Sequence, residues 1–182
     1  MPANPLHFLA IAPLHFKRPE AFDVTALLYS SILVDLELLY SFLTGQPMIH
    51  GIWHSYLYVL TVYTAVLSLI VYAMEAGFEE TIIWIHRFFR LYPEKVRYPL
   101  KTIYFNCLVG GASHVFFDMW VHETSPYILF PLYEGNPFWI GEWSMVVHAL
   151  VALLSVYTLF IWRRHAALHG ESASSKASSD MP

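Results

Sequence analysis

The sequence predicts an all-α fold built as a bundle of four transmembrane helices, with both termini in the cytoplasm. Three observations support this prediction. Four separate apolar stretches each have about 20 residues, the length that crosses a bilayer as a helix. All Lys and Arg residues fall in the segments that would lie on one side of the membrane. Finally, 57% of the 182 residues are hydrophobic and only 13% are charged, a far more apolar balance than that of a soluble domain.

The four predicted spans lie at residues 21–43, 55–74, 102–121 and 143–162. The second contains no charged residue, whereas the other three carry ionisable side chains that need a partner or a cavity. In the third, the adjacent pair Gly110 and Gly111 allows a neighbouring helix to approach closely. We expect one membrane domain over residues 1–169 and a disordered tail at 170–182, which is small and polar.

The 10 Lys and Arg residues predict the orientation, because such residues gather in cytoplasmic loops. All of them precede the first span, lie between the second and third, or follow the fourth, and the loops at 44–54 and 122–142 contain none. We therefore expect an integral protein of the cell or inner membrane with cytoplasmic termini. Residues 3–16 lack a basic start and a cleavage site, so the first span is expected to direct insertion.

Two segments that connect the predicted spans are expected to lie at the membrane interfaces. Residues 78–92 alternate apolar and charged side chains at helical spacing, which predicts a helix lying in the cytoplasmic interface. Such a helix can also meet acidic lipid headgroups. Residues 125–143 hold prolines and many aromatic side chains, as expected for a segment that rests at the outer interface.

Composition also excludes several classes of function. A net charge of −4 and few basic residues argue against a nucleic acid partner. Cys107 is the only cysteine, so an intrachain disulfide and a thiolate metal cluster are both excluded. The expected partners are membrane lipid and a lipid-linked substrate, and an oligomer is compatible with the pattern.

Several ionisable side chains fall at one level of the predicted bundle. An Asp near the centre of a span costs about 2.5–3.5 kcal/mol on insertion scales. Asp35 lies in the outer half of the first span, and His114 and Asp118 share one face of the third by their i, i+4 spacing. His54 opens the second span, and His148 lies near the outer end of the fourth. Imidazole and carboxylate ligands suit Zn, with Mn or Fe as alternatives, so this set predicts a buried metal site.

Two further residues near this level are candidates for moving a proton during catalysis, His50 and Glu37. Glu37 lies about 200° around a helix from Asp35, so the two cannot point at one centre, and we expect Glu37 beside the ligands or at the interface. Four other histidines are interpreted as interfacial or hydrogen-bonded residues rather than ligands: His15, His86, His165 and His169.

A second class of function competes with a metal site. Two carboxylates deep in spans repel each other unless a proton, a cation or a metal lies between them, and Asp35 and Asp118 form such a pair. A non-enzymatic membrane protein would use them for proton or cation transport, or would be an accessory subunit of a larger complex. Four spans without an internal repeat are few for a transporter, which favours the metal-dependent enzyme.

The same residues stand in four short motifs: NPLHF with His7, SSILVDLE with Asp35 and Glu37, HGIWHS with His50 and His54, and GGASHVFFD with His114 and Asp118. In this order, over roughly residues 4–121, they resemble the inner-membrane proteins classed as membrane-bound metal-dependent hydrolases. Val34, Gly51 and Trp53 replace the proline, arginine and threonine usual in that family. The resemblance implies a metal-activated water that attacks an ester or phosphoester, here of a lipid or lipid-linked molecule.

That family is similar in turn to the zinc-dependent phospholipases C and single-strand-specific nucleases, which are all-helical. Their metal ligands follow in the order His, Asp, His and a His-x-x-x-Asp pair, and the same order is seen here in His7, Asp35, His54, His114 and Asp118. Those enzymes continue with a His-x-x-x-Glu pair, whereas here Ala152 stands four residues after His148, so the resemblance implies one or two metals. His7 precedes the first span and reaches the site only if the N-terminal segment re-enters the membrane.

Overall fold

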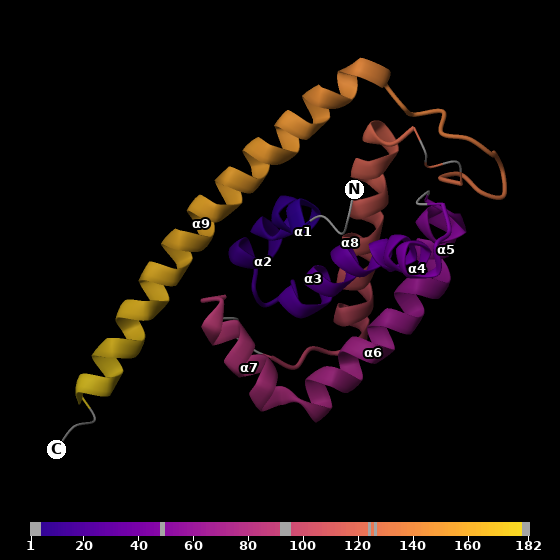
Figure 1. Cartoon of the computed structure of the whole chain (residues 1–182). Coiled ribbons are helices and arrows are strands. Elements are labelled where there is room, and N and C mark those ends of the chain that lie inside the picture. Colours follow the sequence, from indigo (N-terminus) through magenta and orange to yellow (C-terminus); the bar gives the residue numbers. More distant parts are fainter. Residues whose placement is uncertain (1–4, 48–49, 92–95, 124, 126, 180–182) are drawn as a thin grey trace.

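The described chain is mainly helical. The computed structural model describes residues 5–47, 50–91, 96–123, 125 and 127–179, and over these ranges it contains no β-strand. Figure 1 shows the shorter helices gathered around α8 (Leu100–Val121), while α9 (Ser144–Ser179) runs along the outside of the group. The predicted all-α fold is confirmed.

The first predicted span is interrupted by one short turn. It consists of α3 (Val24–Ile32), the 3-10 turn η1 (Leu33–Asp35) and α4 (Leu36–Thr44). Asp23 caps α3 by accepting a 2.8 Å hydrogen bond from the backbone N–H of Thr25, which satisfies one of the free donors of the first turn. The turn η1 ends at Asp35, whose side chain is buried.

The second span begins with a stepwise entry. The 3-10 turn η2 (Ile52–His54) precedes α5 (Tyr56–Tyr58), a π-helical segment η3 (Val59–Tyr63) and the regular helix α6 (Thr64–Gly77). Ser55 caps the start, because its hydroxyl accepts from the N–H of Tyr58 at 3.1 Å. A π-bulge often accompanies a functional site, and this one begins at Val59, one short helix after the buried His54.

Three of the helical segments are long and apolar enough to cross a membrane, and they cover Val24–Thr44, Tyr56–Gly77 and Gly141–Leu168. The third predicted span corresponds to α8, which is 22 residues long but is not among these three. Its hydropathy is lowered by polar side chains such as Asn106, His114 and Asp118, and these are buried by the surrounding helices. The described part of the chain therefore has three candidate spans around one central, more polar helix.

The N-terminal segment lies inside the helical group. It forms α1 (Pro5–Ile11) and α2 (Pro13–Lys17), and α1 packs against α3, α8 and α9. Phe8 and Ile11 are buried together with Val24 and Leu27 of α3. From α9, the Thr158 hydroxyl donates to the carbonyl of Leu9 at 2.7 Å. The predicted re-entrant segment is thus a pair of short helices packed within the group, as Figure 1 shows.

The segment expected at the cytoplasmic interface forms the amphipathic helix α7 (Glu79–Phe88). Its C-terminal turn is tied to α9, where Trp162 Nε1 donates to the carbonyl of Arg90 at 3.2 Å. The ribbon of α9 extends to Ser179 after the 3-10 turn η4 (Gly141–Trp143). Helix α9 therefore extends into the segment 170–182 that was expected to be a disordered tail. The disorder of that tail stays a prediction.

The close approach predicted at Gly110 and Gly111 is confirmed. A Cβ atom at Gly110 would collide with the Ser30 hydroxyl of α3, and one at Gly111 would lie 2.8 Å from Cγ1 of Val59. The two glycines therefore let α8 contact α3 on one side and the start of the second span on the other. This packing brings Asp35, His54 and the second half of α8 to the same place.

Candidate metal centre

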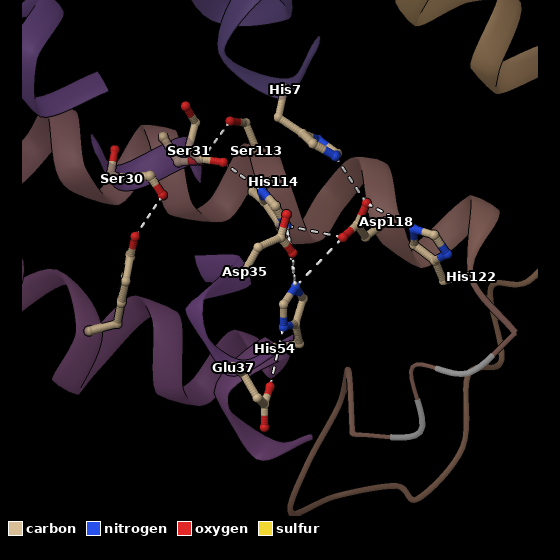
Figure 2. Close-up of polar contacts among 12 residues, drawn as sticks. His7, Ser30, Ser31, Asp35, Glu37, His54, Ser113, His114, Asp118 and His122 are labelled. Carbon is tan, nitrogen blue, oxygen red and sulfur yellow. Dashed lines mark hydrogen bonds and ion pairs between the residues drawn. The ribbon is translucent and has the colours of Figure 1, made fainter. Parts of the chain in front are cut away.

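Four buried side chains converge from three elements, as Figure 2 shows. Asp35 comes from η1, His54 from η2, and His114 and Asp118 from one face of α8. One ligand atom from each lies within 4.8 Å of all the others. All four residues are at most 5% exposed. The structure therefore brings together four of the residues that the sequence predicts as metal ligands.

The separations between these atoms are those of a tetrahedral site. His54 Nε2 and His114 Nε2 are 3.2 Å apart, and each lies 3.3 Å from Asp35 Oδ1. Asp118 Oδ2 lies 3.1 Å from His114 Nε2 and 3.6 Å from His54 Nε2. Ligands about 2.0–2.1 Å from a tetrahedral zinc are separated from one another by about 3.3 Å. The donor set therefore fits a small divalent cation without rearrangement.

Hydrogen bonds on the far side of each imidazole fix which nitrogen faces this centre. His114 Nδ1 lies 2.6 Å from the carbonyl oxygen of Ser31, and His54 Nδ1 lies 3.4 Å from Oε2 of Glu37. Since a carbonyl and a carboxylate only accept, each Nδ1 donates its proton, and Nε2 of each ring faces the centre. Metal-bound histidines in proteins are oriented by such partners.

Asp35 and Glu37 thus contact opposite nitrogen atoms of the His54 ring. This agrees with the expectation that both cannot point at one centre, and it places Glu37 beside a ligand rather than in the donor set. The neighbouring Gly51 leaves the space that Glu37 occupies, because a Cβ atom there would collide with the Glu37 carboxylate.

A second group of donors adjoins the first through Asp118. Ligand atoms of His50, Asp118 and His122 also lie within 4.8 Å of one another. Asp118 Oδ1 is 3.5 Å from His122 Nε2 and 3.2 Å from His7 Nε2. Burial lowers the pKa of His50 to about 3 and also lowers the pKa of His122, so both rings are neutral and have a lone pair to offer a cation.

His7 reaches the centre because α1 is packed inside the helical group. Its ring lies 4.2 Å from that of His114, measured between centroids. His148 is placed differently: its Nδ1 lies 2.8 Å from the carbonyl of Ser144 in its own helix. It lines the cavity beside the centre but does not belong to either donor group among the described residues.

His122 is the one donor that the sequence analysis left out of its site residues. It follows Asp118 by one helical turn, as Asp118 follows His114, so the spacing His114, Asp118, His122 already placed all three on one face of a helix. Because His122 follows the end of the predicted span, the sequence places it near the outer boundary of the bundle and not among the ligands.

The two donor groups open into a small cavity of about 40 Å³, which has room for a few water molecules. It is lined by His7, Asp35, His50, Asp118, His122 and His148, together with apolar residues of α1, α8 and α9. A second, apolar cavity of about 210 Å³ between α8 and α9 shares Phe117, Val147 and Val151 with it. The polar centre therefore adjoins an apolar groove between two helices.

Comparisons of the chain with protein-family models, with curated proteins and with solved structures find no match. Fold and site define the class: an all-helical protein with three helices able to cross a membrane and a buried cluster of histidine and aspartate that could hold a metal ion.

Proposed function

We propose that this chain is a membrane-embedded, metal-dependent hydrolase that cleaves an ester or phosphoester of a lipid-linked substrate. The observation that supports it most is the tetrahedral arrangement of two imidazole nitrogens and two carboxylate oxygens, all buried. Zinc is the metal that this donor set favours. Asp35, His54, His114 and Asp118 would hold it, and a second cation would be held by Asp118 with His50, His122 and His7.

A divalent cation supplies Lewis acidity at the substrate oxygen and yields a nucleophilic water near neutral pH. The chain's own residues orient and surround the reacting groups. Glu37 and the Ser31 carbonyl hold the two ligand rings in place. His148, whose Nδ1 donates to Ser144, has Nε2 left as a proton acceptor beside the cavity, where it can take a proton from water or return one to a leaving group.

A lipid-linked substrate fits the apolar groove between α8 and α9. The groove and the metal cavity share three lining residues, so a molecule whose apolar chain lies in the groove carries its ester into the cavity. Lateral entry from the bilayer needs no water-filled channel. The resemblance to membrane-bound metal-dependent hydrolases agrees with this substrate class.

For the membrane arrangement, we propose that α8 is the fourth span and that both termini are cytoplasmic. Its polar side chains face the other helices, which is how ionisable residues are accommodated in a bilayer. Basic residues of α2, of α7 and of the C-terminal half of α9 mark the cytoplasmic side, opposite the loops next to the metal centre.

The test is hydrolysis by the purified chain in lipid nanodiscs, screened over phosphoesters and carboxylic esters of lipids. Activity is expected to disappear with a chelator, to return with zinc and to be lost in Asp35→Asn. Glu75→Gln is the matched control, because Glu75 is also buried in a span but bonds the N–H of Tyr98, at 3.0 Å, away from the centre. Hydrolysis that survives both chelation and Asp35→Asn would overturn the proposal. Proton or cation flux blocked by Asp35→Asn, without hydrolysis, would favour transport instead.

A further inference from the structure

A large apolar cavity is separate from the metal cavity. Its volume is about 320 Å³, within the range of small-molecule pockets, and its walls come from α1, α3, α7 and α9. Most of the lining is aliphatic or aromatic, including Phe8, Val24, Leu28, Ile82 and Leu159. The cavity shares no lining residue with the metal cavity.

Few polar side chains line this cavity, and among the described residues the buried Nδ1 of His86 has no hydrogen-bond partner. His86 Nε2 lies 3.0 Å from the hydroxyl of Thr25, and burial lowers the pKa of His86 to about 4, so the ring is neutral. Water is a poor occupant of such a space, because a buried water needs two to four polar partners. The cavity therefore suits an apolar chain.

This cavity adjoins a second, basic one. The second has a volume of about 520 Å³ and shares Phe89, Leu159 and Trp162 with the first, and it is also lined by Arg90 and Arg163. No Asp or Glu lines either cavity in the described part of the chain. An apolar chamber thus leads to two guanidinium groups with no acidic neighbour in the lining.

Arg90 occupies a backbone position that ordinarily favours glycine. Its φ is 53°, in the left-handed region, and the N–H of Leu91 returns to the carbonyl of His86 at 2.9 Å, as at a helix end closed by a glycine. A non-glycine residue there carries a conformational cost. The presence of arginine at this strained backbone position is explained if the Arg90 side chain binds a ligand.

We propose that these two cavities form a binding site for an anionic phospholipid, with one acyl chain in the apolar chamber and the phosphate between Arg90 and Arg163. The indole of Trp162 lies between the two regions, the position that tryptophan takes at a membrane interface. The site lies at the end proposed to be cytoplasmic, where the leaflet carries acidic lipids. The proposal rests on the membrane insertion proposed above, but not on the metal centre or its chemistry.

Native mass spectrometry of the full chain tests the site, with phosphatidylglycerol, phosphatidylcholine of the same chains and inorganic phosphate as separate probes. Phosphatidylglycerol is expected to bind more tightly than phosphatidylcholine, and phosphate is not expected to displace it. Arg90→Gln with Arg163→Gln is expected to lower the affinity for phosphatidylglycerol by about 30-fold, at about 1 kcal/mol for each arginine. The control pair, Arg87→Gln with Arg164→Gln, changes exposed basic residues that line neither cavity and is expected to bind as the native chain does.

Arg90→Gly separates binding from folding. Glycine adopts the left-handed backbone conformation of Arg90 without strain, so this variant is expected to raise the thermal stability of the chain in detergent. It is also expected to weaken the binding of phosphatidylglycerol. Equal binding of the two lipids, displacement by phosphate, or unchanged binding in the double variant would overturn the proposal. Arg90→Gln with Arg163→Gln is expected to keep its bound metal. His114→Ala with Asp118→Ala is expected to keep its bound phosphatidylglycerol. Failure of one site is therefore distinguishable from failure of the other.

Discussion

Gly51→Ala is expected to weaken metal binding although Gly51 is not itself a ligand. The backbone of Gly51 has φ −93°, which alanine adopts readily, so the effect of the substitution comes from the added methyl group. That group would collide with Oε1 of Glu37 and lie 3.1 Å from its Cδ. Glu37 must therefore move away from His54.

The structure sets the size of this effect. Glu37 Oε2 is 3.4 Å from His54 Nδ1, already long for a hydrogen bond, so a shift of about 1 Å ends it. Loss of a residue that orients a metal-bound histidine typically lowers metal affinity 10–100-fold. We expect a loss of that order, about 1.4–2.7 kcal/mol, in Gly51→Ala and a similar one in Glu37→Ala.

The assay is competition for zinc against a chromophoric chelator, with the chain in detergent. Gly77→Ala is the matched control, because a Cβ atom at Gly77 meets nothing within 4 Å and the variant should bind zinc as the native chain does. The double variant Gly51→Ala with Glu37→Ala should be little weaker than either single variant, since both act on one hydrogen bond. Zinc affinity in Gly51→Ala within twofold of the native value would refute the role given to Glu37.

Three other predictions follow from the site and the fold. His122→Ala is expected to lower the amount of bound metal without abolishing it, because the first donor group stays intact; complete loss of metal, measured by elemental analysis, would contradict two adjoining groups. The folded chain is expected to lose thermal stability as the pH falls from 6.5 toward 4, because burial depresses the pKa of His86 from its usual 6.5 to about 4, so the unfolded chain takes up the proton first. His86→Gln should lose part of this acid sensitivity in unfolding scans across that range, and an unchanged pH profile would contradict it. Reporters fused after Pro182 and inserted at Gly135 should read out on opposite sides of the membrane; the same side would refute the proposed topology.

The sequence predicts the helical class and the apolar segments well, because length and hydropathy are local properties. It also places α8, predicted at 102–121 and found at Leu100–Val121, but the side chains that make α8 part of the site lower its hydropathy and keep it from being one of the three candidate spans. No local pattern in the sequence predicts the 3-10 turn at Leu33–Asp35 or the π-helical segment at Val59–Tyr63.

Much of the candidate site was also within reach of the sequence. Asp35, His54, His114 and Asp118 were predicted from their common level in the membrane and from the resemblance in chain order. The position of His7 depended on whether α1 enters the helical group, which is a tertiary question. The role of Glu37 depended on the ring orientation of His54, and only the structure gives that orientation.

Metal content per chain tests the central claim most directly. It is measured by elemental mass spectrometry on protein purified without chelator, for the native chain, for His114→Ala with Asp118→Ala, and for Glu75→Gln. The account predicts about one or two zinc ions per chain in the native protein and in Glu75→Gln, and none in the double variant. Absence of metal from the native chain after zinc supplementation, or full retention of metal in the double variant, would contradict it.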